Sequence, residues 1–266
     1  MNGRRTATPN RILNYHKVDT KKELGITVVH PKAFRKQVEF LVRKGYRLVT
    51  LSELFFSQDE KTIAICFDDG YQNVHRYAYP VLKQFNIPAT VFIITSAIGK
   101  SNDWDANLLG IKFMHLDESE IAELIGAGWE IGSHGIGHRC LLNAPVQELE
   151  HDIGQSKEFL ENKFQSQINF YSAPFGKINN RILQICQNSG YLGCCGFYPI
   201  KLLHRPCEEN YVPRLGVYMG DTPQSVEKKL ALDVQTLKWP VMKQNFINFC
   251  NNGTIIVKGI KEKLAL

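Results

Sequence analysis

The sequence lacks any long apolar run and any dense cluster of basic residues. No stretch approaches the roughly 20 consecutive apolar residues that a membrane-spanning helix needs. The net charge of +6 is spread along the chain, which disfavours a dedicated nucleic-acid-binding protein but leaves room for an anionic substrate or membrane surface. The basic N-terminus runs into polar residues without the apolar core of a signal peptide. We therefore expect a location in the cytoplasm or at the cytoplasmic face of the membrane.

Cysteine is present, but not in the patterns that define disulfide frameworks or zinc ribbons. The seven cysteines are an odd number, most stand in apolar surroundings, and no Cys-x-x-Cys pair occurs. Zinc ribbons and thioredoxin-type chemistry are therefore disfavoured, and free thiols fit a reducing compartment. A glycine-rich phosphate loop is also absent, which argues against phosphoryl transfer.

The 266 residues contain apolar strand-like runs that alternate with amphipathic helical runs. Repeated alternation of this kind predicts an α/β fold with a parallel sheet, open or closed into a barrel. The predicted strands are residues 12–15, 47–50, 62–67, 89–94, 129–131, 168–171, 192–195 and 211–215. The predicted helices are residues 31–45, 73–85, 117–126, 146–164 and 180–187.

A composition shift that would mark a linker is missing, as are internal repeats and low-complexity tracts. One domain over residues 1–266, with a core of about residues 11–220, is therefore the simplest interpretation. The polar segment 99–116 is expected to form a loop over the strand ends. The tail 235–266 contains a candidate closing strand at 254–257, and its role stays open.

Two adjacent carboxylates, Asp68 and Asp69, follow the apolar run 62–67 and precede Gly70. Within a strand, neighbouring side chains point to opposite faces, so such a pair rarely shares one site. At the C-terminal end of a strand, a glycine can release the turn and let both carboxylates reach the same place. An ordinary tight turn is the alternative, because Asp and Gly both suit one.

His134 and His138 form a His-x-x-x-His pair just after another apolar segment. In parallel α/β folds the chemistry gathers at the C-terminal ends of the strands, where the Asp pair also lies. The sequence therefore predicts a site in which one Asp and both His bind a metal ion and the second Asp acts as a base. Two His ligands favour zinc or a similar transition metal over magnesium. Two structural histidines are the alternative.

The Asp and His motifs, in this order, resemble the polysaccharide deacetylase family, also called the NodB-homology family or carbohydrate esterase family 4. Residues 65–94 resemble its first motif with the helix and strand that follow, and residues 130–138 resemble its second motif. The resemblance covers about residues 11–220. It implies a distorted (β/α) barrel with fewer than eight regular repeats, and a metal-dependent hydrolase that removes an N-acetyl group from an amino sugar.

The resemblance also implies a role for each motif residue. Asp68 would be the general base, while Asp69, His134 and His138 would hold a divalent ion, with Zn²⁺ expected and Co²⁺ or Ni²⁺ as alternatives. Residues 172–176 resemble the third motif, in which the backbone N–H of the aromatic residue stabilises an oxyanion. That role would fall to Phe175, next to Pro174.

Ser172 departs from the family pattern, because many members carry an Arg at this position that braces the catalytic Asp. Arg214 is a candidate substitute. A structural or surface Arg is the alternative.

The opening segment 12–18 resembles the circularly permuted branch of the family, which includes exopolysaccharide and poly-N-acetylglucosamine deacetylases. The usual C-terminal Leu-x-His is missing, since residues 255–258 end in Lys258. In the permuted branch the equivalent strand is N-terminal, so His16 would protonate the departing amine. A structural histidine is the alternative.

Aromatic side chains near the motifs have two interpretations. Tyr71 and Trp104 could stack on a sugar ring or could pack in the interior. The remaining histidines are interpreted as surface or packing residues; they are His30, His75, His115, His151 and His204.

The sequence thus predicts N-deacetylation of a polysaccharide or glycoconjugate, with an N-acetylated sugar as partner and no nucleic acid. One alternative is a deacetylase or deformylase of a lipid-linked or small amino sugar at the cytoplasmic face, with peripheral membrane association. An alternative of another class is a carbohydrate-binding pseudoenzyme. The only feature that supports it is Ser172, in place of the Arg that many family members carry. The sugar, the acyl group and the oligomeric state are not given by the sequence.

Overall fold

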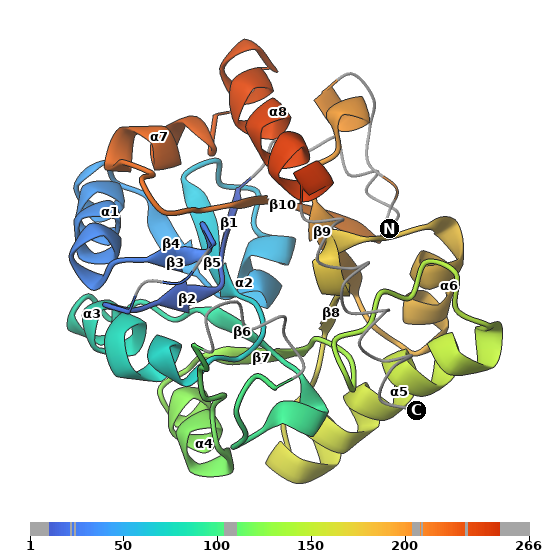
Figure 1. The fold of residues 1–266 in the computed structure, drawn as a ribbon. Coiled ribbons are helices and arrows are strands. Elements are labelled where there is room, and N and C mark those ends of the chain that lie inside the picture. Colours follow the sequence, from blue (N-terminus) through green and yellow to red (C-terminus); the bar gives the residue numbers. More distant parts are fainter. Residues whose placement is uncertain are drawn as a thin grey trace.

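The computed structural model describes residues 11–21, 23, 25–103, 111–203, 208, 210–231 and 234–250. Their centre is a barrel of parallel strands (Figure 1). Within the described residues seven strands form a closed ring, in the order β1-β10-β9-β8-β7-β6-β5, because β5 also pairs with β1. An eighth strand, β4, pairs with the first half of β5. This arrangement confirms the predicted distorted (β/α) barrel.

The ring strands lie close to the predicted ranges, with ends that differ by at most two residues. They are β1 (Ile12–Tyr15), β5 (Thr62–Phe67), β6 (Thr90–Ile93), β7 (Glu130–Ser133), β8 (Phe170–Ser172), β9 (Gly193–Phe197) and β10 (Tyr211–Gly216), with β4 at Arg47–Val49. A separate pair, β2 (Lys17–Val18) and β3 (Val28–Val29), follows β1.

Helices surround the ring (Figure 1). They are α1 (Pro31–Arg43), α3 (Tyr79–Gln84), α4 (Glu118–Gly126), α5 (Val146–Phe164), α6 (Asn180–Asn188), α7 (Pro223–Lys228) and α8 (Val234–Cys250). A π-helical turn, η1 (Val74–Ala78), leads into α3, and the 3₁₀ turns are η2 (Thr95–Ala97), η4 (Pro174–Gly176) and η5 (Ile200–Leu203). No helix among the described residues combines the length and the apolar character needed to cross a membrane.

Side-chain caps explain where several helices begin. Asp117 and Glu120 form the predicted capping box at the start of α4, because each side chain accepts from the backbone N–H of the other. Asn179 caps α6 by accepting from the backbone of Ile182. At the other end of α1, Gly45 adopts a φ of +77°, which lets the chain leave the helix.

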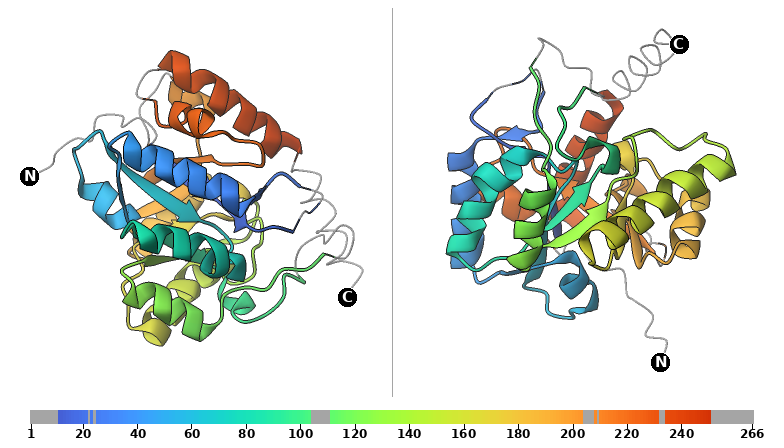
Figure 2. Two further views of the ribbon diagram at one scale, coloured as in Figure 1. Left: turned by 90° about the vertical axis from the view of Figure 1, so that its left-hand side faces the viewer. Right: turned by 90° about the horizontal axis from the view of Figure 1, so that it is seen from below.

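The interior of the barrel has an apolar floor and a polar layer above it. The floor packs Ile12, Ala64, Cys66, Phe92, Phe170, Cys195 and Val212 together with Leu51 and Leu54 of α2 (Leu51–Phe56). The short helix α2 lies across the end of the barrel where the strands begin (Figure 2). Side chains of a strand alternate between the faces of the sheet, so the residues two positions further along point inward as well. These residues are Asn14, Asp68, Ser172 and Arg214, all buried.

Helix α8 covers β10 from outside and was not predicted. Its Gln244 accepts from the backbone N–H of Gly216 and donates to the carbonyl of Arg214 at 3.1 Å, while Leu237 and Val241 pack against Leu215. The first part of the predicted tail is therefore a helix that braces β10. The candidate closing strand at 254–257 lies outside the described residues.

Candidate metal centre and active site

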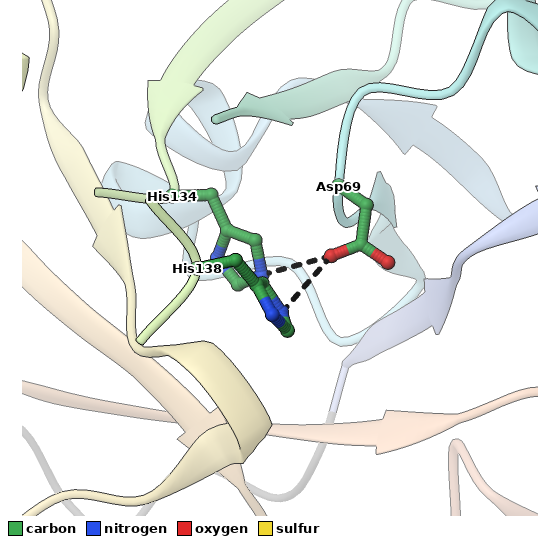
Figure 3. Close-up of side chains that lie close together, drawn as sticks. All are labelled: Asp69, His134 and His138. Carbon is green, nitrogen blue, oxygen red and sulfur yellow. Dashed lines mark ion pairs between the residues drawn. The ribbon is translucent and has the colours of Figure 1, made fainter. Parts of the chain in front are cut away.

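Asp69 turns away from the barrel interior at the point where β5 ends. Its backbone has a φ of +68°, and that of Gly70 is +64°. A positive φ is strained for a residue other than glycine, so the surrounding structure must hold this turn in place. The turn brings Asp69 Oδ1 to 3.2 Å from His134 Nε2 and 3.3 Å from His138 Nε2 (Figure 3). The two adjacent carboxylates thus reach one site from different directions.

The two histidines approach Asp69 with their Nε2 atoms. His134 directly follows β7, and its Nδ1 lies 2.6 Å from the carbonyl oxygen of Ser172. A carbonyl can only accept, so Nδ1 carries a proton, and Nε2 is the ring nitrogen that faces Asp69 and is available to a metal ion. The ring of His138 lies 4.7 Å from that of Phe175, centroid to centroid. Both imidazoles thus present Nε2 to Asp69, and the Nδ1 contact of His134 with Ser172 orients that ring.

Asp69, His134 and His138 fit a metal ion. One ligand atom from each lies within 4.8 Å of the other two. Asp69 Oδ1 is buried, and within the described part of the chain no donor reaches it with ordinary hydrogen-bond geometry. Burial alone would raise the pKa of Asp69, but the facing imidazoles hold it well below its usual range. One carboxylate and two imidazoles are a donor set typical of catalytic zinc sites that keep further positions open.

Asp68 lies in the polar layer of the barrel and accepts four hydrogen bonds. Oδ1 accepts from Ser172 Oγ at 3.1 Å and from Arg214 Nη1 at 2.9 Å. Oδ2 accepts from Asn14 Nδ2 at 2.7 Å and from Arg214 Nη2 at 3.0 Å. Burial would raise the pKa of Asp68, but Arg214, and then His134 and His16, lower it to about 2. This carboxylate therefore stays ionised at neutral pH.

Arg214 pairs with Asp68 in a bidentate fork inside the barrel. Its Nη1 also donates to Asn14 Oδ1 at 2.9 Å and its Nη2 to Ser172 Oγ at 2.8 Å. The guanidinium lies 5.0 Å from the ring centroid of Phe92 in the apolar floor. Burial lowers the pKa of Arg214, but the Asp68 carboxylate more than offsets this and raises it. Arg214 thus contacts the carboxylate that the missing Arg at position 172 would brace.

His16, Phe175 and Pro174 also lie around this site. His16 stands between β1 and β2, near enough for its charge to lower the pKa of both Asp68 and Asp69. Phe175 has a φ of +58° in η4, with its ring against His138, and Pro174 is buried beside it. The catalytic and oxyanion-binding roles of these three residues stay predictions.

The structure bears on the predicted sugar-stacking role of Tyr71 but not on that of Trp104. The Tyr71 side chain is fully buried and stacks on His115, with ring centroids 4.7 Å apart. Lys17 Nζ lies 4.7 Å from the centroid of the Tyr71 ring. This burial favours the packing interpretation over sugar stacking. Trp104 lies outside the described residues.

Two residues of the site were not identified from the sequence. Asn14 interrupts the apolar run 12–15 two residues before His16, which places it on the interior face, and this pattern could have identified it. His115 is buried and stacks on Tyr71, which agrees with the packing interpretation, and its Nδ1 also lies 2.8 Å from the backbone oxygen of Asp69. Its apolar neighbours in the sequence give no signal for this contact.

With this geometry established, comparison with known proteins identifies the family. The model of the polysaccharide deacetylase family matches residues 57–193. The chain belongs to the polysaccharide deacetylase family. This membership confirms the resemblance predicted from the motifs, and deacetylases of this family depend on a metal ion.

Individual relatives agree with the family. YxkH of Bacillus subtilis, assigned provisionally to the polysaccharide deacetylases, is 32% identical over 186 residues, which are 68% of this chain and 61% of that protein. The chain thus spans about three fifths of that relative's length. The poly-β-1,6-N-acetyl-D-glucosamine N-deacetylase of Staphylococcus epidermidis is 29% identical over 231 residues, 76% of this chain and 77% of that one. The solved structure of the Streptococcus pyogenes deacetylase PplD shares the fold, with a TM-score of 0.72, 19% identity, and coverage of 85% of this chain and 100% of that chain.

Proposed function

We propose that this chain is a metal-dependent hydrolase that removes an N-acetyl group from an amino sugar within a polysaccharide or glycoconjugate. The observation that carries the proposal is that two adjacent carboxylates have different partners. Asp69 converges with His134 and His138 on one point, and Asp68 is held beside them as an ionised acceptor.

Asp69, His134 and His138 would hold the ion through one carboxylate oxygen and two Nε2 atoms. Two imidazole ligands favour Zn²⁺, with Co²⁺ and Ni²⁺ as alternatives. When bound, such an ion supplies a Lewis acid that polarises the amide carbonyl of the substrate and activates the attacking water. The Nδ1 contact of His134 with the Ser172 carbonyl keeps the ligand tautomer fixed.

Asp68 would take the proton of the attacking water as general base. A carboxylate has about four acceptor positions, and all four are occupied here. One donor therefore has to yield as the proton arrives. The Ser172 hydroxyl makes the longest of the four contacts, at 3.1 Å, and can rotate away, whereas the fork of Arg214 stays in place. The attacking water would then take the place of the Ser172 hydroxyl as a hydrogen-bond donor to Asp68.

Protonation of the leaving amine and stabilisation of the oxyanion would use residues around the metal centre. His16 would protonate the departing amine as general acid. The backbone N–H of Phe175 would donate to the oxyanion, in a conformation fixed by its positive φ. Trp104 stays a prediction for sugar stacking.

The printed name of the Staphylococcus epidermidis relative gives its substrate as poly-β-1,6-N-acetyl-D-glucosamine. We propose an N-acetylated amino-sugar polymer of this kind for the present chain. Lipid-linked and small amino sugars, and an N-formyl group, are the alternatives. The described cysteines Cys66, Cys140, Cys186, Cys194 and Cys195 are free, which supports a reducing compartment.

The test is acetate and formate release by metal-loaded protein on poly-N-acetylglucosamine, chitin oligomers, nucleotide sugars and lipid-linked amino sugars. The proposal predicts acetate release from the polymer that a chelator stops and that re-addition of Zn²⁺ restores. Release from the small or lipid-linked substrates alone would select the alternative. An absence of release from every substrate by protein that binds no metal would favour a carbohydrate-binding pseudoenzyme.

We also propose that α8 contacts an anionic membrane surface. Trp239, Met242 and Phe246 follow each other at helical spacing on one face of α8, and Trp239 and Phe246 are 71% and 69% exposed. At 100° per residue, Lys238 and Lys243 flank this face on either side, and α8 contains no Asp or Glu. Aromatic residues between lysines suit an interface with anionic lipid headgroups.

Vesicle sedimentation tests this contact. Vesicles with anionic phosphatidylglycerol should bind the protein, in a manner weakened by salt, and Trp239→Ala with Phe246→Ala should abolish binding. The matched control is Phe56→Ala on α2, which removes an aromatic side chain that is 68% exposed elsewhere. Failure of the wild type to bind, or equal loss in the control, would refute the membrane contact.

A further inference from the structure

The turn that separates the two metal-binding histidines is held from outside by helix α5. Gly135 follows His134 with a φ of +78°. Asp152, on the face of α5 that packs toward the barrel, accepts from the backbone N–H of Ile136 through Oδ2 at 3.2 Å. A Cβ on Gly135 would lie only 2.4 Å from Asp152 Oδ1, so the turn and the carboxylate are in close contact. The glycine is required both by its backbone angle and by this approach.

The same turn is also tied to the opposite side. The carbonyl of Gly135 accepts from the backbone N–H of Thr95 at 3.1 Å, and that of Ile136 accepts from Ser96 at 3.0 Å. These carbonyl contacts leave the N–H of Ile136 to α5. On the N–H side of the turn, Asp152 holds the N–H of Ile136 and Ser133 Oγ accepts from the N–H of Gly135 at 3.1 Å, while η2 holds the carbonyl side.

A buried carboxylate at this position is otherwise costly. Asp152 is 7% exposed, and its neighbours on the same buried face of α5 are Ser156 and the apolar Leu149, Ile153 and Leu160. Burying a charged group without hydrogen bonds destabilises a protein, so packing alone does not account for an Asp here. The bond to Ile136 supplies a specific reason for a side-chain oxygen.

We propose that Asp152 is a positioning residue of the metal centre. By holding the turn between His134 and His138, it sets the relative position of their Nε2 atoms. The inference rests on the proposed metal site and adds a residue on α5 that acts through the backbone N–H of Ile136. Partners that orient ligands in this way typically contribute about 10- to 100-fold to metal affinity.

The experiment is a titration of the metal-free full chain with Co²⁺, followed by the visible absorption of the bound ion, which reports ligand geometry. Asp152→Ala should weaken Co²⁺ binding by about 10- to 100-fold and change the spectrum. Asp152→Asn keeps an oxygen acceptor and should rescue both readouts. The control is Leu160→Ala, which opens a cavity on the same face of α5 without touching the turn; it should lower the melting temperature and leave Co²⁺ affinity unchanged.

A double-mutant cycle keeps the proposal testable if Asp152→Ala folds poorly. Gly135→Ala places a methyl group against the Asp152 carboxylate. It should therefore displace the turn and also weaken Co²⁺ binding in a folded protein. In the Asp152→Ala background the clash is absent, so Gly135→Ala should cost less affinity there than in the wild type. Additive losses would overturn the proposal, as would wild-type Co²⁺ affinity and spectrum in Asp152→Ala. If the wild type itself binds no Co²⁺, the metal centre fails; if it binds Co²⁺ but releases no acetate, only the proposed hydrolysis fails.

Discussion

Asp68 and Asp69 are neighbours in the sequence but lie in opposite surroundings. Asp68 continues the inward alternation of β5 and accepts hydrogen bonds from Asn14, Ser172 and Arg214. Asp69 leaves the strand through a positive φ, and its Oδ1 faces two imidazoles without a well-aligned donor among the residues that the structure describes. An Asp side chain thus has all its acceptor positions occupied by hydrogen bonds at position 68 and is available to a metal ion at position 69. The backbone turn, and not the residue type, divides the two functions.

The charges around the two carboxylates differ as well. A guanidinium with a permanent charge is the largest influence that lowers the pKa of Asp68, whereas imidazoles do so for Asp69. An Arg fork stabilises an anion without competing for protons, while imidazoles can give up their protons and bind a metal. The comparison therefore predicts that changes around Asp69 remove the metal and that changes around Asp68 do not.

The largest effect is expected at the ligands. His134→Ala removes one of three donor atoms and should eliminate both bound metal and acetate release, with the fold retained. Elemental analysis and a melting curve measure this directly. The matched control is His75→Ala, whose imidazole contacts Glu123 at the surface and which should keep both properties. Full metal content in His134→Ala would remove this residue from the metal centre.

The next largest effect is expected at Arg214. Arg214→Met leaves the buried Asp68 carboxylate without its charge partner and should lower the free energy of unfolding by about 3–5 kcal/mol. Turnover should fall by about 10²-fold, because the base loses its orientation. Denaturant unfolding and metal analysis together test the prediction, since the bound metal should persist. Loss of metal from Arg214→Met, as in His134→Ala, would show that the surroundings of Asp68 and the metal site at Asp69 do not function separately.

A smaller effect is expected at His16. His16→Ala should slow acetate release by about 10²-fold, a typical cost of losing a general acid, while stability and metal content stay close to wild type. His151→Ala on the exposed face of α5 serves as the control. Wild-type rates for His16→Ala would refute the assignment of this histidine as the acid.

The smallest effect on turnover is expected at a buried ion pair that belongs to neither carboxylate. Asp221 lies 2.7 Å from Lys229. Burial would raise the pKa of Asp221, but Lys229 lowers it below the usual value. A carboxyl whose folded pKa is depressed stabilises the fold above its unfolded pKa of about 3.9 and loses this contribution as the pH falls through the folded pKa. Asp221→Asn should therefore destabilise at pH 7, show a shrinking difference from wild type below about pH 4, and leave acetate release unchanged. An equal difference at pH 7 and pH 3 would contradict this.

Much of the ring could be predicted from the sequence, because each strand is a local apolar run and each ligand follows the end of one. Arg214 shows the limit. Its position on the inward face follows from the alternation in β10, but its partner depends on ring closure, which brings Asn14 and Arg214 together from 200 positions apart. No local pattern contains that pairing, so the choice between a brace for Asp68 and a structural Arg stayed open.

Helices α2, α7 and α8 were missed for different reasons. Helices α2 and α7 have only six residues each, too few to show a helical period. Helix α8 is apolar toward β10 through Leu237 and Val241 and apolar toward solvent through Trp239 and Phe246, which removes the periodic contrast that marks a helix. Asp152 was missed because its partner is a backbone N–H of a distant turn, for which a sequence carries no signal.

The most direct test of the account is the zinc content of Asp68→Asn and Asp69→Asn, measured side by side after loading with Zn²⁺ and removal of free metal. The account predicts one zinc per chain and no acetate release for Asp68→Asn, and no bound zinc for Asp69→Asn. Loss of zinc from Asp68→Asn, or active zinc-bound Asp69→Asn, would contradict the division of roles between the two carboxylates.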